Sequence, residues 1–387
     1  MRPLRIAMLA PFGIRPKGTL LARMLPLAHA LSACGHAVHI IAPPIHNPQD
    51  AETSVMHGTV RVTHTAVASD GAFGVFRQAQ LLWRAIAADA PDIIHLFKPK
   101  GHAGLTARWA RLVAPHIPLV VDCDDRESVG GWNDELPYPT SAKALFRWQE
   151  RDLPRSADAV TVASRTLQSL VWADGVTREA TFYLPNAANI VQQSAFAPRT
   201  DPVLVLYTRF WEFDLTTMIT IMTQIVAHRP DVHLHVIGTG ENGEEQRFAQ
   251  LLVQHQVDAY VSMHGWMQPA DIPNVLQQAS IAIVPVIDTL INRSRCSAKL
   301  LELLAAGLIV VGHDVGEMRT FVQHGENGYL VDPDDTDAFV AAVCTILDDP
   351  SRCTTMQQAA YQSAYRHAWE TRVPACEAAY AYAMSGR

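Results

Sequence analysis

The chain has 387 residues, of which 49% are hydrophobic and 18% are charged, and its formal net charge is −7. This composition predicts a globular protein of two or three domains and excludes disordered, collagen-like and coiled-coil chains. An acidic chain without a basic run also argues against nucleic acid as the main partner.

No segment of the sequence suggests a membrane span or a signal peptide. The longest apolar run, from Leu303 to Gly312, is far shorter than the roughly 18 to 20 residues that a bilayer span needs. The start, from Met1 to Phe12, has too short an apolar segment for a signal peptide and predicts a first strand instead. Six cysteines without a Cys-x-x-Cys pair favour reduced thiols. We therefore expect a cytoplasmic protein.

In the first half of the chain, short apolar runs alternate with longer amphipathic stretches, which is typical of βα units that build a parallel sheet. Strands are predicted over residues 4–9, 37–42, 59–65, 92–97, 119–122 and 159–162. Helices are predicted over residues 20–33, 75–88, 105–113 and 142–153.

A second series of strands follows a connection that contains Pro185 and Asn186, and the domain boundary is placed near Asn189. Its strands are predicted over residues 203–207, 233–237, 260–263, 281–284, 308–311 and 329–331, and the stretch 354–384 is helical by pattern. The predicted fold class is α/β, with two Rossmann-like doubly wound domains over residues 1–190 and 191–370. Residues 371–387 would form a helix that returns to the first domain. Domains of this kind bind ligands where loops leave the carboxyl ends of strands, so the expected site is the cleft between the two.

The most informative segment, residues 296–311, runs from a loop into a helix that carries Lys299 and Glu302 near its start. Three residues apart, these side chains share one helix face beside the amino-terminal pole. A carboxylate there can accept hydrogen bonds from a ribose diol, while an ammonium and free helix N–H groups favour phosphate. The pair suits a nucleoside diphosphate, although an ordinary surface ion pair has the same spacing.

This segment resembles the ribose-binding helix of the retaining glycosyltransferases of family 4, which have the GT-B architecture of two facing Rossmann-like domains. Weaker matches to that family follow in the same order along the chain, at Gly18 and over residues 27–31, 35–38, 92–95, 157–164, 185–187 and 325–331. The resemblance is specific because many weak matches fall in the right order.

The resemblance implies roles for individual residues on the donor side. Glu302 would hold the nucleotide ribose, Lys299 the diphosphate or the sugar, and Arg209 the diphosphate, with Gly18 in the family's glycine loop. The domain over residues 191–370 would thus bind the nucleotide-sugar donor, and the domain over residues 1–190 would face the acceptor.

Three positions depart from the family pattern. Asp214 replaces a lysine five positions after the arginine, Ser294 replaces the first of two glutamates eight apart, and Thr320 replaces a common glutamate. These departures bear on sugar selectivity and on activity itself.

In the first domain, acidic residues gather at the end of a predicted strand, over residues 122–127. Many family members have a histidine at or near Asp124, so the resemblance implies that Asp124 and Asp125 are the catalytic carboxylates. They would orient the acceptor hydroxyl or stabilise positive charge on the sugar; a solvated acidic turn is an equally good interpretation. Asp122 and Asp124 also form an Asp-x-Asp motif, which is a weak metal signal. In GT-B enzymes helix poles and basic groups replace the metal, so no cofactor and no obligatory metal ion are expected.

Positive charge follows another strand end of the first domain, at Lys98, Lys100 and His102. We assign these residues to the acceptor side. Together with a row of basic residues, Lys143, Arg147 and Arg151, they suggest a phosphate-bearing acceptor or peripheral contact with an anionic membrane. Glu150 and Asp152 dilute the row, and a solvated helix face is the preferred interpretation of it.

Two further sequence patterns resemble sites of other functions, a dinucleotide site and a metal site. Gly238 and Gly240 begin a Gly-x-Gly-x-x-Gly sequence, but it lies in the second βα unit of its domain, so we interpret it as a tight loop beside the donor nucleotide and not as an NAD site. His233 and His235 share one strand face without a third ligand nearby in sequence, which favours a packed pair over a metal site.

The sequence thus predicts a metal-independent retaining glycosyltransferase that moves a sugar from a nucleotide-sugar donor to a sugar, lipid-linked or small-molecule acceptor hydroxyl, in glycan, glycolipid or envelope polysaccharide synthesis. Two alternatives remain: a nucleotide-sugar epimerase or hydrolase of the same fold, and a catalytically inactive GT-B binding subunit. The base, the sugar, the acceptor and the oligomeric state stay open.

Overall fold

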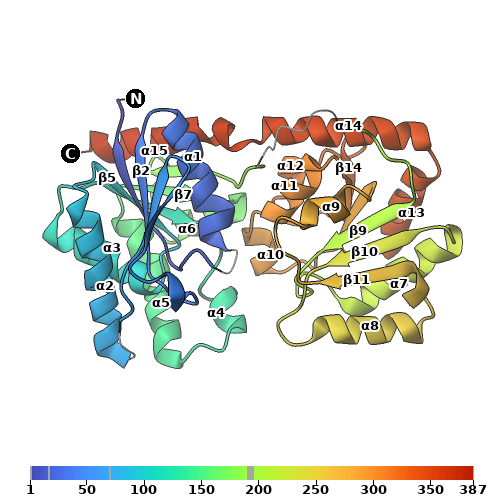
Figure 1. Cartoon of the computed structure of the whole chain (residues 1–387), viewed down its shortest axis with the longest axis horizontal. Helices are drawn as coiled ribbons and strands as arrows, with labels where there is room; N and C mark the ends of the chain where they lie inside the picture. Colours follow the sequence, from blue (N-terminus) through green and yellow to red (C-terminus); the bar gives the residue numbers. More distant parts are fainter. Residues whose placement is uncertain (1, 16–17, 69–70, 190–195, 387) are drawn as a thin grey trace. The chain divides into compact units, whose positions relative to one another are not determined.

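The computed structural model describes residues 2–15, 18–68, 71–189 and 196–386 (Figure 1). Contacts divide the chain into two compact units. Unit 1 comprises Met1–Ala187, Ser294–Cys296 and Trp369–Arg387, and unit 2 comprises Ala188–Arg293 and Ser297–Ala368. Among the described residues, no helix combines the length and the apolar character that crossing a bilayer requires.

Unit 1 is built on an eight-stranded sheet in the order β3-β4-β2-β1-β5-β6-β7-β8. All neighbouring pairs are parallel except β3 and β4, which form an antiparallel hairpin. The strands are β1 (Arg5–Leu9), β2 (Ala37–Ala42), β3 (Ser54–His57), β4 (Val60–His64), β5 (Ile93–Phe97), β6 (Leu119–Cys123), β7 (Ala159–Val162) and β8 (Thr181–Tyr183). Every residue of β5, β6 and β7 is buried, as expected for central strands covered on both faces.

Helices cover both faces of this sheet. On one face α1 and the terminal α15 share a core with strand residues such as Ile6 and Met8, and Tyr380 of α15 is fully buried in it. Helices α2 and α3 pack on each other, and α3 also packs on α5 and β5. The helices of unit 1 are a π-helical turn (Leu20–Met24), α1 (Leu25–Ala33), a 3-10 turn (Pro48–Asp50), α2 (Gly71–Ala88), α3 (Gly101–Val113), α4 (Trp132–Glu135), α5 (Thr140–Ser156), α6 (Arg165–Ala173), a 3-10 turn (Trp369–Arg372) and α15 (Val373–Ser385).

Unit 2 contains a six-stranded, fully parallel sheet in the order β11-β10-β9-β12-β13-β14. Its strands are β9 (Val203–Tyr207), β10 (His233–Ile237), β11 (Val261–Gly265), β12 (Ile281–Val284), β13 (Ile309–His313) and β14 (Gly328–Val331). Its helices are α7 (Leu215–His228), α8 (Glu244–Gln254), a 3-10 turn (Asp258–Tyr260), α9 (Ile272–Leu276), α10 (Leu290–Ser294), α11 (Ala298–Ala305), α12 (Met318–Phe321), α13 (Thr336–Leu347) and α14 (Pro350–Arg366). Helices α7, α8 and α13 contribute to one large apolar core with β9 and β10.

Two doubly wound parallel sheets confirm the predicted fold class. Strands β3 and β8 were not predicted, because β3 is exposed at the sheet edge and β8 has only three residues. The helical stretch predicted over residues 354–384 is interrupted by the 3-10 turn that begins at Trp369. Unit 1 also includes the segment Ser294–Cys296, from the end of α10, which the sequence pattern did not indicate.

In each sheet the strand order reverses at one point, and a crevice forms there at the carboxyl ends of the strands. In unit 1 the reversal lies between β1 and β5, and in unit 2 it lies between β9 and β12. The loops that follow β5 and β9 carry Lys98 and Arg209, so the topology places predicted site residues at both reversal points.

Candidate functional site

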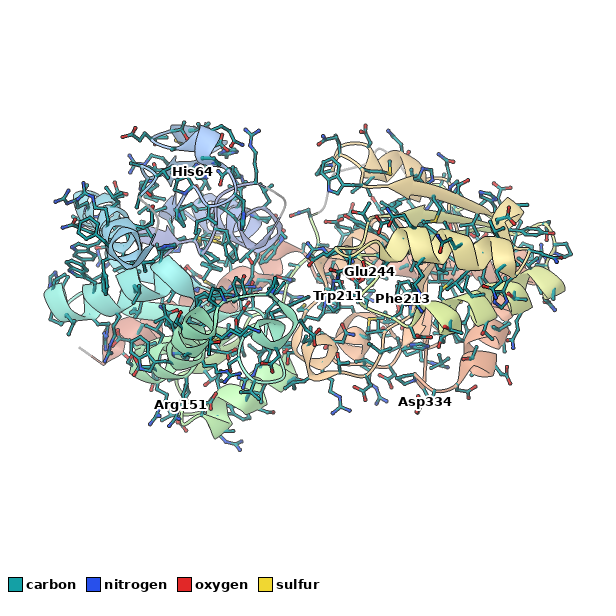
Figure 2. All side chains as sticks on the ribbon, turned by 90° about the horizontal axis from the view of Figure 1, so that it is seen from below. His64, Arg151, Trp211, Phe213, Glu244 and Asp334 are labelled. Atoms are coloured by element: carbon teal, nitrogen blue, oxygen red, sulfur yellow. The ribbon has the colours of Figure 1, made fainter. Side chains whose placement is uncertain are left out.

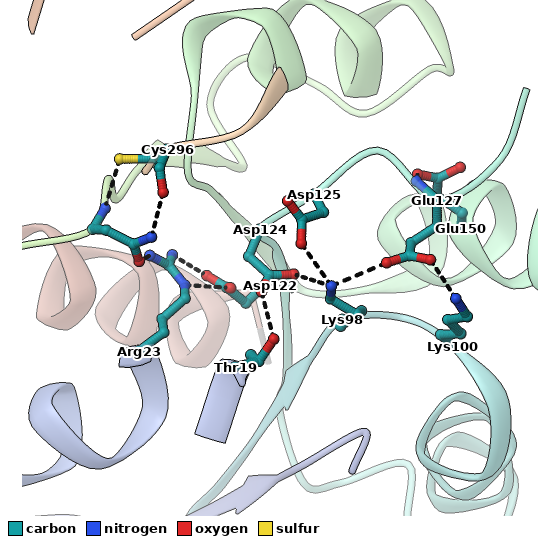
Figure 3. Close-up of polar contacts among 11 residues, drawn as sticks. Thr19, Arg23, Lys98, Lys100, Asp122, Asp124, Asp125, Glu127, Glu150 and Cys296 are labelled. Atoms are coloured by element: carbon teal, nitrogen blue, oxygen red, sulfur yellow. Dashed lines mark hydrogen bonds and ion pairs between the residues drawn. The ribbon is translucent and has the colours of Figure 1, made fainter. Parts of the chain in front are cut away.

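Three acidic residues of unit 1 lie in a turn that directly follows β6, next to the loop that follows β5. We call Asp124, Asp125 and Glu127 the acid turn. Lys98 lies among them, with its Nζ 2.7 Å from Asp125 Oδ2, 3.0 Å from Glu127 Oε1 and 3.7 Å from Asp124 Oδ1 (Figure 3). Only 8% of the Lys98 side chain is exposed, so this ammonium is a buried counter-ion for three carboxylates.

Lys100 is also turned inward. Its ammonium donates to Glu127 Oε2 and lies 4.5 Å from the ring centroid of Tyr138 and 4.9 Å from that of Phe146. Both ammonium groups are thus buried and paired with carboxylates within unit 1, which does not favour the predicted acceptor-side role of Lys98 and Lys100.

Lys98 and His102 show how local backbone shapes this loop. Lys98 has a φ of +57°, a left-handed conformation that is uncommon for a residue with a Cβ and is found at functional or tightly constrained positions. His102 lies in the first turn of α3, where its carbonyl accepts a hydrogen bond from Thr106 Oγ1 at 2.8 Å. Burial lowers the pKa of the His102 imidazole.

Asp124 combines a contact to Thr19 with a raised pKa. Its Oδ2 accepts a hydrogen bond from Thr19 Oγ1 at 3.0 Å, and its Oδ1 is buried without a hydrogen-bond partner among the described residues. Burial raises the pKa of Asp124 to about 7, against the opposing charge of Lys98 and with support from the charge of Asp125. A carboxyl group that changes charge near neutral pH suits acid–base or charge-stabilising chemistry.

Gly18 lies just before Thr19, and its carbonyl accepts the Ala22 N–H at 2.9 Å in the π-helical turn. The Thr19 hydroxyl therefore connects the predicted glycine loop to Asp124. Single π-helical turns within helices occur frequently at functional sites.

Asp122 cannot serve in a metal-binding Asp-x-Asp motif as the structure stands. Arg23 Nε and Nη2 donate to its two oxygens at 2.8 Å and 2.6 Å, and both side chains are buried. Thr161 Oγ1 donates a further hydrogen bond. Burial lowers the pKa of Arg23, but the contact with Asp122 more than compensates and keeps the guanidinium charged.

Arg23 also belongs to a chain of hydrogen bonds that the sequence analysis did not predict. Arg23 Nη1 donates to Asn186 Oδ1 at 2.9 Å, and Asn186 Nδ2 donates to the Cys296 carbonyl at 2.6 Å (Figure 3). This contact holds the segment Ser294–Cys296 in unit 1, two residues before α11 begins. A lone arginine within the apolar stretch of residues 20–33 was the only sequence signal for it.

In unit 2 the predicted donor residues surround Tyr207, at the carboxyl end of β9. The Lys299 ammonium lies 5.5 Å from the centroid of the Tyr207 ring. Burial raises the pKa of the Tyr207 phenol, the charge of Glu302 raises it further, and the charge of Arg209 lowers it. Arg209, Lys299 and Glu302 therefore all lie near the Tyr207 ring.

The exposure of these residues differs from that of the acid turn. Arg209 is exposed, Glu302 is partly exposed, and the Lys299 side chain is 18% exposed. Both Lys299 and Glu302 lie on α11, whose first turn is capped by Ser297 Oγ accepting the Leu300 N–H at 3.4 Å. The helix position and the accessible cation fit the binding of an anionic ligand.

Glu212 is a site residue that the sequence analysis missed. Its carboxylate pairs with Lys299 and accepts hydrogen bonds from Thr208 Oγ1 at 2.7 Å and from the Arg209 N–H at 2.8 Å. Its carbonyl accepts the Ile287 N–H at 2.9 Å, which ties the loop after β9 to the loop after β12. Its place three residues after Arg209 was the only available signal.

The structure gives local reasons for two of the three departures from the family pattern. Asp214 is the N-cap of α7, where its Oδ1 accepts the Thr217 N–H at 2.8 Å. The Thr320 hydroxyl donates to Glu317 Oε2 at 3.0 Å. Ser294 Oγ is buried and has no hydrogen-bond partner within residues 2–15, 18–68, 71–189 and 196–386.

The glycines after β10 build a tight loop. A Cβ on Gly238, whose φ is +122°, would lie 1.9 Å from the Thr208 carbonyl oxygen, so only glycine fits there. The Gly238 N–H donates to the Gly265 carbonyl, and the Gly240 N–H donates to Glu245. Both glycine amides are thus engaged, and the start of α8 carries two carboxylates, Glu244 (Figure 2) and Glu245, which disfavour the phosphates of a dinucleotide.

The histidine pair is part of a surface row. His235 Nδ1 and His264 Nε2 are 2.9 Å apart in a hydrogen bond, and His233 Nε2 contacts Ser262 Oγ at 2.8 Å. The part of the chain that the structure describes contains no group of three or more His, Cys, Asp or Glu side chains with metal-binding geometry.

Two family models match the chain in the order of its two units. The model described as "Glycosyl transferase 4-like domain" matches residues 18–187, and the model described as "Glycosyl transferases group 1" matches residues 201–349. Together they span most of the sequence.

Curated relatives and solved structures agree with these matches. A phosphatidyl-myo-inositol mannosyltransferase from Mycolicibacterium smegmatis is 22% identical over 377 residues, which cover 95% of this chain and 90% of that protein. The sucrose-phosphate synthase from Thermosynechococcus elongatus superposes with a TM-score of 0.76 at 18% identity, covering 99% of this chain and 100% of the other. Anabaena HepE in complex with UDP and glucose superposes with a TM-score of 0.66 at 17% identity, covering 97% and 99%.

Proposed function

The chain belongs to the glycosyltransferases of family 4, with the GT-B fold, and from this premise we propose that it is a retaining enzyme that transfers a hexose from a nucleotide sugar to an acceptor hydroxyl. The observation that carries the proposal is the grouping of Arg209, Lys299 and Glu302 around Tyr207 at the strand-order reversal of unit 2.

Each donor residue has a chemical task in this proposal. Glu302 accepts hydrogen bonds from the ribose hydroxyls, while Arg209 and Lys299 bind the diphosphate and stabilise the charge that develops on it as the glycosidic bond breaks. Two cations and a helix amino terminus supply the positive charge that a metal ion supplies in other enzymes, so the proposed reaction requires no metal. The donor proposal gains support from HepE, whose structure contains UDP and glucose.

The acid turn is proposed as the catalytic element of unit 1. In a front-face retaining transfer the leaving phosphate and the acceptor lie on the same side of the sugar, and a carboxylate orients the acceptor hydroxyl or stabilises the positive charge. Asp124 is the proposed group, and Asp125 holds Lys98 beside it at 2.7 Å. Because the charged form of Asp124 is required, activity should rise as the pH increases through about 7.

For the acceptor we propose a lipid-linked or inositol-containing alcohol, in glycolipid synthesis at the cytoplasmic face of a membrane. Support comes from the Mycolicibacterium smegmatis relative, which is a phosphatidyl-myo-inositol mannosyltransferase and is matched over 90% of its length. On unit 1, Phe73 and Phe76 of α2 are 79% and 61% exposed, and Arg77 follows them. Arg151 is exposed on α5 (Figure 2). Exposed aromatic and basic side chains of this kind suit peripheral contact with anionic lipids.

A thermal-shift screen tests the donor proposal. UDP, GDP, ADP and dTDP sugars are each added in excess, and a true donor raises the melting temperature by mass action. Glu302→Ala should abolish the shift, whereas Asp334→Ala, at an exposed position of unit 2, should leave it unchanged. If wild type and Glu302→Ala respond alike to every nucleotide sugar, the proposal fails.

Product analysis separates the alternative reactions. A transferase consumes donor only when acceptor is present and yields a product with the donor's anomeric configuration, which NMR coupling constants report. An epimerase or hydrolase consumes donor without acceptor. Binding of a nucleotide sugar without turnover under either condition would identify an inactive binding subunit, to which the replacement of a glutamate by Ser294 points.

A further inference from the structure

Glu212 contacts the Lys299 ammonium and the backbone of Arg209, and it does so through the two oxygens of one carboxylate. Its Oε1 pairs with the Lys299 ammonium, while its Oε2 accepts hydrogen bonds from Thr208 Oγ1 and from the backbone N–H of Arg209. Only 8% of the Glu212 side chain is exposed. This buried carboxylate therefore carries one charge that is shared between Lys299 and the loop after β9.

The loop that Glu212 stabilises contains a residue in an uncommon left-handed backbone conformation. Phe210 adopts a φ of +68°, and its N–H donates to Thr208 Oγ1 at 2.8 Å. The Glu212 carbonyl accepts hydrogen bonds from the Ile287 N–H at 2.9 Å and from Asn292 Nδ2 at 3.3 Å. The main chain at Glu212 is thus held by the segment that follows β12, through its loop at Ile287 and through α10 at Asn292, so one carboxylate oxygen can change partner without loss of the turn.

Lys299 is the partner that a ligand can reach. Its side chain is 18% exposed, and it belongs to the first turn of α11, whose N–H groups favour anions. A donor diphosphate that binds Arg209 and Lys299 brings two or more negative charges beside the charge of Glu212. Like charges at such distances repel strongly in a partly buried site. The diphosphate and Glu212 therefore compete for the same ammonium.

We propose that Glu212 is a positioning residue and a built-in competitor in the donor site: in the empty site it holds Lys299 through one oxygen and the Arg209 loop through the other, and the donor diphosphate displaces it from Lys299. This inference rests on the proposed donor site. It adds Glu212 to the residues of that site. It also explains what holds Lys299 in place before the donor binds, in a chain that has Asp214 where the family often has a lysine.

The test measures affinity by isothermal titration calorimetry, with UDP and GDP as probes and inorganic pyrophosphate as a probe that has no base. Glu212→Gln removes the competing charge and retains the size of the side chain. It should bind the diphosphates about threefold to tenfold more tightly, because each tenfold corresponds to only about 1.4 kcal/mol of relieved repulsion. Its kcat should fall, because a single amide oxygen cannot serve both Lys299 and the loop.

A double-mutant cycle with Lys299→Met isolates the competition. In the Lys299→Met background, Glu212→Gln should no longer tighten binding. Asp231→Asn is the matched control, since it makes the same charge change in unit 2 at a side chain that is 57% exposed and pairs with Arg229. It should change neither affinity nor kcat.

The outcomes distinguish this inference from the proposed function. If wild type binds none of the probes, both are overturned. If wild type binds but Glu212→Gln binds equally or more weakly, or if the tightening persists with Lys299→Met, Glu212 is only a structural residue and the inference alone fails. If Glu212→Gln does not fold, Glu212→Asp replaces it; the shorter carboxylate withdraws from Lys299, so tightening in the same direction is expected and its absence refutes the inference.

Discussion

The two units treat their charged residues in opposite ways. In unit 1 the Lys98 ammonium is 8% exposed and surrounded by three carboxylates, and Asp122 is fully buried against Arg23. In unit 2 Arg209 is exposed, and Lys299 keeps an accessible surface while it pairs with Glu212. The same residue types thus organise a polar interior in one unit and remain available to a ligand in the other. Exposure and pairing, rather than residue type, decide which cations can recognise a phosphate.

The largest effect that this comparison predicts is on the stability of unit 1. Lys98→Met leaves Asp124, Asp125 and Glu127 without their shared counter-ion and should lower the free energy of unfolding by about 3–5 kcal/mol. Denaturant unfolding measures it. Arg147→Met is the control, because Arg147 forms an exposed pair with Asp134 at 3.3 Å and should cost less than about 1 kcal/mol. If Lys98→Met has normal stability and loses only affinity for the acceptor, Lys98 binds the acceptor as the sequence analysis predicted.

The next effect concerns Asp124 and depends on pH. Its pKa is raised in the folded state from 3.8 to about 7, so folding favours the protonated form, and the resulting penalty grows from about pH 4 and is complete above pH 7. Asp124→Asn removes this penalty. Its melting temperature should exceed that of wild type at pH 8 by more than at pH 5, with an upper limit of about 4 kcal/mol in stability. Activity should fall in the same variant.

Asp134 provides a control because its pKa is shifted in the opposite direction to that of Asp124. Its hydrogen bond from the Gly130 N–H lowers its pKa, so the stability that it contributes is present above the ordinary carboxyl pKa and is lost in acid. Asp134→Asn should therefore lose stability at pH 8 relative to wild type. Equal pH trends for Asp124→Asn and Asp134→Asn would contradict the difference between the two carboxylates.

In unit 2 the prediction is a loss of ligand affinity without a loss of stability. Arg209→Ala should weaken the binding of nucleoside diphosphates about 10- to 100-fold, which is the range for one charge-assisted contact of about 1.5–3 kcal/mol. Its melting temperature without ligand should stay unchanged, because the side chain is exposed. Arg247→Ala, an exposed arginine on α8, is the control for net charge. If Arg209→Ala destabilises the protein, Arg209 is a structural cation like Lys98 and not a ligand-binding one.

The smallest effect concerns Asp214, whose carboxylate caps α7. Asp214→Ala should cost about 1 kcal/mol of stability, whereas Asp214→Asn, which retains a capping oxygen, should be nearly neutral. Differential scanning calorimetry resolves the two. If the two variants are equally stable, capping of α7 does not explain why Asp214 stands where the family often has a lysine.

These residues also show how far sequence reasoning reaches. The strand-and-helix pattern predicted two doubly wound domains, and the spacing of Lys299 and Glu302 together with the ordered resemblance predicted the family, both of which are confirmed. The direction in which Lys98 and Lys100 point was not predictable, because it depends on carboxylates that follow a neighbouring strand. Glu212 and Cys296 escaped for the same reason, since their contacts join segments about 90 to 110 residues apart.

The division of the chain has a consequence for biosynthesis. Unit 1 contains the first residues of the protein and also the last described ones, and α15 supplies Cys376, Ala379 and Tyr380 to its core. Ribosomes release chains from the amino terminus, and most domains fold in that order. Here the nascent unit 1 must wait, with one face of its sheet uncovered, until residues 369–387 emerge. Unit 2, which lacks only the three-residue excursion Ser294–Cys296, can complete its core earlier. The core of unit 1 is therefore completed only by a helix that is synthesised after all of unit 2.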